Sequence, residues 1–563
     1  MKFSTKYRLF LVCLAAGLSG LPGHAAPVAV APHGMVVTEQ NLATEIGRAI
    51  LQRGGNAVDA AVAIGYAEAV VYPCCGNIGG GGFMLIHLAG KPDFFLDFRE
   101  TAPLAAGAAM YLDAAGKPIP GASIYGWRAA GVPGTVMGME TARQRFGRLS
   151  RAEVMAPAIT LARDGFVLGE EDARMIKAAS RLADDPAAAR LFRRPDGSPL
   201  LAGDRLIQPD LARTLENIAE HGPTAFYRGS LPRRIEAAAK EGNGLLTRQD
   251  FARYRAVWRT PVHCRYRGYD IASAAPPSSG GVVLCEALNI LQGYDLKSLG
   301  YHSAAAIQRI AEAERHAFLD RNNALGDPDF IANPVAHLTD PGYARAIRAT
   351  IVPDRATASS SLPPGTPPHE KYETTHYSVV DAAGNAVSVT YTINGRFGAQ
   401  VMAPGTGVLM NDEMDDFTTA VGQPNMFGLR QGARNAIAPG KRPLSSMAPT
   451  IVSRDGKLML VLGSPNGSRI ISVVLQTIIN VVDYGMRIDQ AVAASRIHEQ
   501  YLPDFLYTEP DALPTATELD LQKMGYTLRQ IPPFGAAEAI EAVGDQWVGA
   551  NDPRSPMGSA LGY

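Results

Sequence analysis

Residues 374–381 read TTHYSVVD and residues 386–393 read AVSVTYTI, and the run DAAGN separates them. Alternation of period two on both sides of a turn-forming run predicts a β-hairpin. The preceding residues, 354–373 (DRATASSSLPPGTPPHEKYE), are rich in Ser and Pro and almost free of apolar side chains. That composition predicts an exposed linker. The sequence therefore predicts an irregular linker that ends abruptly where a buried sheet begins.

Thr374 stands at this junction and would become a nucleophile if the bond after Glu373 were cut. Its new α-amine, with an ordinary pKa of about 8, could accept the proton of its own hydroxyl. The same hydroxyl could first cut the chain, by attacking the Glu373 carbonyl to form an ester that water opens. The local residues leave two alternatives open: a plain transition from linker to strand, and Thr375 as the nucleophile.

Upstream of the linker the patterns predict helices, strands and a glycine-rich turn. Asn56 is expected to cap a helix at residues 57–71 that follows a first helix at 41–53. The glycine run precedes a strand rather than a helix, so it does not match a dinucleotide-binding loop and indicates close backbone approach in a crowded sheet. The expected elements are helices at 41–53 and 57–71, the glycine run at 76–82, strands at 83–88 and 94–98, and mainly helices from 150 to 349.

Downstream of the hairpin, residues 458–462 are typical of a strand and residues 468–482 of a long apolar helix. The run GSPNG at 463–467 joins them. Backbone N–H groups converge at a helix N-terminus, where the helix dipole favours an anion.

The chain has 563 residues and a formal net charge of −1, with Lys and Arg spread along its length. Nucleic-acid binding would need a basic stripe, and none is present in the sequence. Residues 1–25 have the form of a signal peptide: a basic start, a short apolar run at 9–21, and small residues before a cleavage point after Ala25. An uncleaved anchor helix is the alternative. This pattern predicts export to the periplasm. No later stretch reaches about 18 uninterrupted apolar residues, so the mature protein is expected to be free of the membrane.

Four cysteines follow the signal peptide: Cys74, Cys75, Cys264 and Cys285. This is few for an exported chain of this length, so disulfides are not expected to form its framework. Adjacent cysteines such as Cys74 and Cys75 rarely bond to each other, and the pairing stays open. No Cys or His spacing matches a zinc site, so the sequence predicts no metal.

The hairpin and several other motifs, in order along the chain, resemble the γ-glutamyltransferase (γ-glutamyltranspeptidase) family of N-terminal-nucleophile hydrolases. The matching stretches are GGNAVDA at 54–60, GNIGGGG at 76–82, DFRE at 97–100, TTHYSVVD at 374–381, GNAV at 384–387, TYTIN at 390–394, NDEMDDF at 411–417, RPLSSM at 442–447, GSPNGSR at 463–469 and DPRS at 552–555.

The resemblance implies an α+β fold, a four-layer αββα sandwich. It also implies cleavage between Glu373 and Thr374. The products would be a large subunit of residues 26–373 and a small subunit of residues 374–563, held in one intertwined heterodimer. Thr374 would be the nucleophile.

The resemblance also implies a substrate site for a γ-glutamyl group, which carries an α-carboxylate and an α-ammonium. A carboxylate needs a forked cation and hydroxyl donors, and an ammonium needs carboxylate and amide oxygens. The matching positions are Arg99, Ser445 and Ser446 for the carboxylate, and Asn394, Glu413 and Asp416 for the ammonium. Taken singly, each has an ordinary alternative as an ion pair, turn or loop.

Three further features follow from the family pattern. Thr392 matches the threonine that supports the nucleophile, and the backbone N–H groups of Asn466 and Gly467 would bind the oxyanion. Many family members have Gly-Gly where this chain has Asn466. Residues 417–441 resemble the active-site lid, and Phe427 stands where bacterial relatives commonly have Tyr, which removes a phenolic hydrogen bond.

The implied activity is cleavage of γ-glutamyl amides such as glutathione through a γ-glutamyl ester, followed by transfer to water, an amino acid or a dipeptide. No cofactor is required. Three alternatives remain: an acylase for glutaryl-type side chains, which would not need acids at 413 and 416; a catalytically silent scaffold; and a transferase that anchors poly-γ-glutamate.

Overall fold

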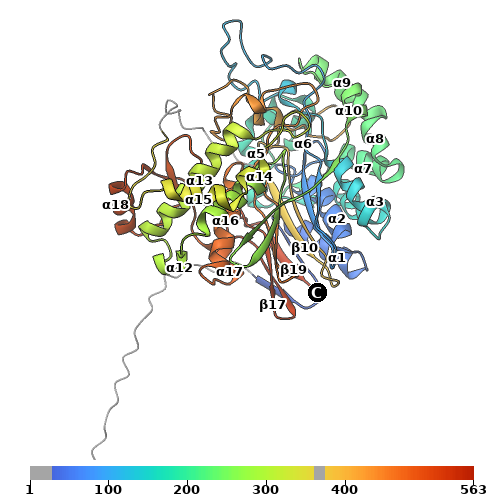
Figure 1. Cartoon of the computed structure of the whole chain (residues 1–563). Coiled ribbons are helices and arrows are strands. Elements are labelled where there is room, and N and C mark those ends of the chain that lie inside the picture. Colours follow the sequence, from blue (N-terminus) through green and yellow to red (C-terminus); the bar gives the residue numbers. More distant parts are fainter. Residues whose placement is uncertain (1–27, 360–373) are drawn as a thin grey trace, which may run out of the picture.

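The computed structural model describes residues 28–359 and 374–563; the expected signal peptide and Glu373 lie outside these ranges. In the described residues, two seven-stranded antiparallel sheets pack face to face, and helices cover the outer face of each (Figure 1). This is the αββα arrangement that the sequence predicts.

The first sheet has the predicted hairpin at its centre. Its strands alternate residues between the outer helices and the second sheet, as period-two patterning requires. In spatial order they are β19 (Ser559–Gly562), β2 (Met35–Thr38), β10 (Thr375–Val380), β11 (Ala386–Thr392), β3 (Gly81–His87), β4 (Phe94–Asp97) and β7 (Val257–Arg259). The hairpin β10–β11 and the strands after the glycine run are confirmed.

The second sheet carries the strand that leads into the predicted oxyanion turn. In spatial order its strands are β1 (Val28–Ala31), β18 (Gln546–Ala550), β17 (Ala539–Val543), β13 (Lys457–Leu462), β12 (Thr450–Arg454), β9 (Tyr269–Ser273) and β8 (Val262–Tyr266). The expectation of mainly helices from 150 to 349 missed β7, β8 and β9, which are short and half exposed and so lack a clean alternating pattern.

Helices α1 (Asn41–Gln52) and α2 (Ala57–Val71) cover the outer face of the first sheet. Asn56 caps α2 as predicted: its side chain accepts the N–H groups of Val58 and Asp59, while the Asp59 carboxylate accepts the N–H of Asn56. Every residue of α2 is buried, because a second helical layer packs outside it. That layer and its neighbours comprise α3 (Thr135–Phe146), α4 (Arg151–Asp164), α5 (Glu170–Ala178), α6 (Pro186–Phe192), α7 (Pro209–His221), α8 (Pro223–Tyr227), α9 (Ser230–Glu241) and α10 (Arg248–Arg253), with the short pair β5 (Phe166–Val167) and β6 (Arg205–Leu206).

The outer face of the second sheet packs against α11 (Gly280–Leu291), which contacts β8 and β9. Helices α13 (Ala304–Ala324) and α16 (Arg469–Val482) pack against α11, on the opposite side of the molecule from α1 and α2 (Figure 1). Around them lie α12 (Leu296–Leu299), α14 (Val335–Leu338), α15 (Pro341–Thr350), α17 (Ile488–Ala493), α18 (Thr515–Lys523) and the three-stranded sheet of β14 (Ile497–His498), β15 (Leu506–Thr508) and β16 (Leu528–Gln530).

Segments on both sides of residue 374 alternate within each sheet. In the first sheet, β2 lies between β19 and β10, and β3 pairs with β11. In the second, β1 pairs with β18 and β9 with β12. A length-based division into separate domains therefore does not describe this chain.

Within the described residues, two disulfides join the four cysteines: Cys264–Cys285 and Cys74–Cys75. The second corrects the expectation that these adjacent residues do not bond to each other. Both sulfurs lie in the buried turn between α2 and the glycine run, where the Cys74 carbonyl accepts the N–H of Phe397. The packed turn holds the two side chains together.

In the same ranges no helix combines the length and the apolar character needed to cross a membrane.

Candidate active site

Thr374 lies at the start of β10, directly across from the end of β11. The register pairs Thr375 with Tyr391, which places Thr374 opposite Thr392. The Thr374 hydroxyl donates to Thr392 Oγ1 over 3.3 Å, and Thr392 Oγ1 also accepts the Asn394 N–H at 2.8 Å. Thr374 is buried, with 6% of its surface exposed. The cross-strand threonine thus holds the predicted nucleophile in one orientation.

Thr375 and His376 are held by two buried carboxyl groups. Thr375 donates its hydroxyl hydrogen to Glu68 of α2 at 3.1 Å, and the His376 N–H donates to Glu39 at 2.9 Å. Burial without a nearby cation raises the pKa of Glu68 to about 8. Because successive strand residues face opposite ways, the Thr375 hydroxyl points toward α2, away from Thr374 and Thr392. Of the two candidate threonines, only Thr374 faces the pocket described next.

A small pocket opens at Thr374. Its free volume is about 20 Å³, close to the space that one water molecule occupies by the same measure. It is lined by Thr374, Thr392, Asn394, Glu413, Asp416, Phe427, Leu429, Ser445, Ser446, Met447, Gly467 and Ile470. Eight of the ten residues predicted as catalytic or substrate-binding are among them, and the remaining two, Arg99 and Asn466, lie directly behind.

Arg99 is completely buried and lies within ion-pair distance of three acids: Glu413 and Asp416 of the pocket, and Glu100 at 3.7 Å. It donates to Glu413 and, at 2.5 Å, to Asp416 Oδ2. Burial raises the pKa of Glu413 and of Asp416 from their ordinary values, against the attraction of Arg99. The second Glu413 oxygen has no hydrogen-bond partner among the described residues. The predicted carboxylate-binding cation and the predicted ammonium-binding acids therefore pair with one another, while one Glu413 oxygen is left over.

Ser445 and Ser446 form the opposite wall. Main-chain bonds fix Ser445: its N–H donates to the Pro277 carbonyl, and the Ser279 N–H donates to the Ser445 carbonyl, both at 2.8 Å. The Ser446 hydroxyl accepts a hydrogen bond from Arg321 at 3.2 Å. Both serines line the same pocket as Glu413 and Asp416, and Arg99 lies behind these acids, so the site combines the groups that a zwitterion requires.

The turn at 463–467 connects β13 to α16 beside the nucleophile. Asn466 has a φ of 105° and Gly467 a φ of 56°, both in the region that favours Gly and Asn. A Cβ on Gly467 would lie 2.4 Å from the ring of Phe427, so only glycine fits there. Asn466 thus takes a backbone conformation suited to an oxyanion turn despite its side chain, and the N-terminus of α16 follows at once.

Phe427 and Leu429 close the pocket from the predicted lid, residues 417–441. The Phe427 ring is 4% exposed and packs on Gly467, and its carbonyl accepts a bond from Gln500 at 3.1 Å. A γ-glutamyl group is larger than the free volume, so substrate access requires this cover to move.

The structure also identifies residues that the sequence did not single out. Arg321, on α13, and Gln431, in the lid, are buried behind Ser446 and bonded to each other at 2.9 Å. Arg321 falls within residues 150–349, which the sequence predicts only as mainly helical. Arg321 stands among other charged and polar residues of this helix, and nothing in the local sequence links it to Ser446.

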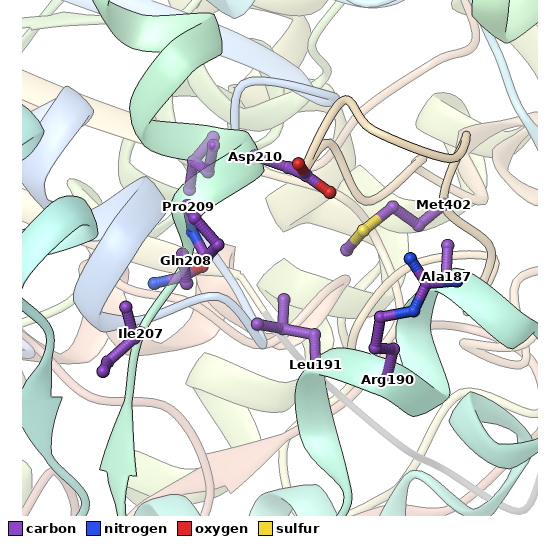
Figure 2. Close-up of a pocket in the computed structure, with 10 residues that line it drawn as sticks. Ala187, Arg190, Leu191, Ile207, Gln208, Pro209, Asp210 and Met402 are labelled. Atoms are coloured by element: carbon purple, nitrogen blue, oxygen red, sulfur yellow. The ribbon is translucent and has the colours of Figure 1, made fainter.

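In the described ranges no group of three or more His, Cys, Asp or Glu side chains is arranged to hold a metal ion. A larger cavity of about 200 Å³ lies between α6 and the start of α7, with Arg190 and Leu191 on one side, Pro209 and Asp210 on the other, and Met402 beside them (Figure 2). None of the predicted site residues lines it.

Comparison with known proteins agrees with this geometry. The family model described as Gamma-glutamyltranspeptidase matches residues 43–562. The chain is 52% identical to a glutathione hydrolase proenzyme of Pseudomonas sp. (strain A14), over 96% of this chain and 95% of that protein. Among solved structures it is similar to a cephalosporin acylase from Bacillus halodurans (27% identity, TM-score 0.84, 98% and 99% of the two chains). It is also similar to the Helicobacter pylori gamma-glutamyltranspeptidase (42% identity, TM-score 0.57, 62% of this chain and 97% of that one).

Proposed function

The chain belongs to the gamma-glutamyltranspeptidase family, and from this premise we propose that it is an exported enzyme that cuts itself before Thr374 and then cleaves γ-glutamyl amides such as glutathione. The single observation that carries the proposal is the pocket at Thr374, which brings a hydroxyl nucleophile together with acids, a cation and hydroxyl donors. A γ-glutamyl group offers the complementary charges.

In the proposed first step, Thr374 Oγ attacks the γ-carbonyl and its proton passes to the new α-amine of Thr374. The oxyanion is bound by backbone N–H groups of the Asn466–Gly467 turn. The tetrahedral intermediate collapses, the amine leaves with a proton, and a γ-glutamyl ester remains on Thr374. Water, an amino acid or a dipeptide then attacks the ester, which gives ping-pong kinetics and regenerates the hydroxyl.

In the proposed substrate orientation, the α-carboxylate lies near Ser445, Ser446 and Arg99, and the α-ammonium near Asn394, Glu413 and Asp416. Support comes from the mutual pairing of Arg99 with Glu413 and Asp416, because a zwitterion can exchange partners with that arrangement. We further propose that the large and small subunits stay together as a heterodimer. The proposed export to the periplasm rests on the signal-peptide pattern of residues 1–25.

A second candidate is an acylase for glutaryl-type side chains, and the likeness to the cephalosporin acylase structure favours it. A glutaryl group lacks the ammonium, so Glu413 and Asp416 would have no cationic substrate group to bind.

The decisive experiment compares release of the anilide from L-γ-glutamyl and glutaryl anilides by the purified mature protein. Turnover of the γ-glutamyl compound alone supports the transferase. Equal or better turnover of the glutaryl compound supports the acylase, and no turnover of either contradicts both.

Self-cleavage has its own test in a matched pair of variants. Thr374→Ala is expected to yield one uncut, inactive chain. Thr375→Ala, which removes only the bond to Glu68, is expected to be cut at the same place. Intact mass and N-terminal sequencing measure both. An uncut Thr375→Ala chain beside a cut Thr374→Ala chain would reverse the assignment.

A further inference from the structure

Arg321 is a buried cation that lacks an acidic partner. It lies near the end of α13 and is 1% exposed. Its guanidinium donates to the Ser279 hydroxyl at 3.1 Å, the Asn322 and Gln431 amide oxygens at 3.0 and 2.9 Å, and the Ser446 hydroxyl at 3.2 Å. All four acceptors are neutral. Among the described residues no carboxylate lies within ion-pair distance of it. Because isolated charges are costly to bury, such a cation calls for an explanation.

The same helix shows how this fold treats an arginine whose role is structural. Arg315 is also buried, and it pairs with Glu499 at 2.9 Å and with Asp504 at 2.6 Å. Burial, together with the nearby Arg99, lowers the pKa of Arg321 to about 10 against the attraction of Asp416, so its guanidinium remains charged at neutral pH. The lack of an acidic partner is therefore specific to the position of Arg321 and is not a general feature of buried arginines on this helix.

That place is the back of the pocket wall. Arg321 contacts Ser446, which lines the pocket, and Gln431, whose own side chain donates to the Asp416 carbonyl at 3.0 Å. Asp416 and Arg99 are the charged side chains whose fields act on Arg321. Since Ser446 Oγ accepts the Arg321 N–H, its own hydrogen is left to point elsewhere, and the pocket is the open direction. A hydroxyl polarised by a cation is a stronger donor to an anion.

Among the charged groups described around the pocket, one cation lacks an anion at ion-pair distance. Arg99 already has Glu413, Asp416 and Glu100 within ion-pair distance, whereas no carboxylate of the described residues lies that close to Arg321. A bound ammonium would draw on the two acids, and a bound carboxylate would supply the anion that Arg321 lacks. We propose that Arg321 is a positioning residue for the donor substrate, which holds the α-carboxylate through Ser446 and thereby makes the site select γ-glutamyl over decarboxylated donors. This inference rests on the proposed function.

The test uses two donors that differ only in the group concerned: L-γ-glutamyl anilide and 4-aminobutyryl anilide, which keeps the ammonium and lacks the carboxylate. Arg321→Gln is expected to raise KM for the γ-glutamyl donor about 10- to 100-fold, the range that corresponds to the loss of one hydrogen bond involving a charged group. Its KM for the 4-aminobutyryl donor is expected to change less than about threefold, and kcat for either donor to change little. Arg321→Lys, which keeps the charge, is expected to restore most of the preference.

Arg315→Gln is the matched control on the same helix. It removes a paired arginine, so it is expected to lower stability and to leave the ratio of the two KM values unchanged. If Arg321→Gln raises both KM values equally, or neither, the residue is structural and the inference is overturned.

If Arg321→Gln does not fold, Arg321→Lys decides: a folded Lys variant that loses the preference contradicts a role for the charge. A wild-type enzyme that ignores γ-glutamyl anilide would instead contradict the proposed function, and the two failures are thus distinct.

Discussion

Two buried ionic clusters in this molecule differ in whether their charges are matched. The C-terminal cluster consists of Arg496, Arg554, Glu509 and Asp552; the pocket cluster consists of Arg99, Arg321, Glu413 and Asp416. In the first, Asp552 pairs with both arginines and also accepts the N–H groups of Ala537 and Arg554. In the second, Arg321 has no acid, and a Glu413 oxygen has no partner among the described residues.

The pKa values of the buried acids shift in opposite directions in the two clusters. The attraction of Arg496 and Arg554 lowers the pKa of Asp552 even though burial acts the other way. Burial prevails in the pocket, where it raises the pKa of Glu413 and Asp416. A complete set of partners fixes a structure, while an incomplete one leaves charges available for a ligand. Four experiments test this distinction.

The largest effect is expected in the matched cluster. Arg496→Met leaves Asp552 buried with one of its two cations missing, which should lower the free energy of unfolding by about 3–5 kcal/mol. Guanidinium denaturation followed by circular dichroism measures the change. KM for γ-glutamyl anilide should stay within about twofold at a temperature where the variant is folded. A large rise in KM without loss of stability would show that the two clusters do not differ as described.

Arg99→Lys tests the pocket cluster with its charge retained. Lysine cannot donate to Glu413 and Asp416 with the forked geometry of a guanidinium. We expect kcat/KM for γ-glutamyl anilide to fall about 30- to 1000-fold, with a smaller loss of stability than in Arg496→Met. The control is Arg496→Lys, measured in the same two assays. Equal stability losses for Arg99→Lys and Arg496→Met would contradict a division between binding and structural charges.

Lowering the pH should affect substrate binding at the pocket cluster before it affects stability through the C-terminal cluster, without any mutation. As pH falls, the pocket acids with raised pKa gain protons first and lose their attraction for an ammonium. Affinity for L-glutamate, measured by calorimetry from about pH 7 to pH 4.5, should therefore weaken by up to about tenfold per pH unit. A group with a raised folded pKa binds protons more tightly when folded, so this step does not destabilise the protein.

Asp552 has a lowered folded pKa, so its contribution to stability is present above its unfolded value of about 3.8 and is lost only below it. The guanidinium concentration at the unfolding midpoint should consequently stay constant over the pH range in which affinity for L-glutamate declines. Parallel loss of affinity and stability would argue against the separation.

The smallest effect is expected at the cover of the pocket. Phe427→Tyr adds a hydroxyl to the ring that packs on Gly467 without changing its shape. We expect a change of about two- to fivefold in the ratio of transfer to hydrolysis, measured with a dipeptide acceptor, and little change in KM. Phe427→Leu, which removes the aromatic cover, serves as the comparison and should lower the ratio of transfer to hydrolysis.

The sequence predicted the frame of the site well, because its signals are local. The alternating hairpin, the Asn56 cap and the glycine run each depend on residues close in the chain, and each occurs as predicted. The choice of Thr374 over Thr375 came from the family resemblance. Strand alternation supplies an independent reason, since Thr375 is turned toward Glu68.

The remaining features depend on distant partners. No local pattern could pair Arg99 with Glu413, which lies more than three hundred positions later, or place Arg321 behind Ser446. Strands β8 and β9 were missed because their burial comes from the neighbouring β12 and α11 rather than from their own alternation. The bond between Cys74 and Cys75 likewise follows from the packed turn around them, which spacing alone does not reveal.

The interleaving of β2 between β19 and β10, and of β1 beside β18, has a thermodynamic consequence once the chain is cut. Before cleavage, folding is a unimolecular reaction in which the linker keeps both halves at high effective concentration. After cleavage, refolding requires two separate polypeptides to associate and to insert their strands into shared sheets. If the chain is cut as proposed, the mature enzyme is expected to keep its structure because it unfolds slowly, and its recovery after denaturation is expected to depend on protein concentration.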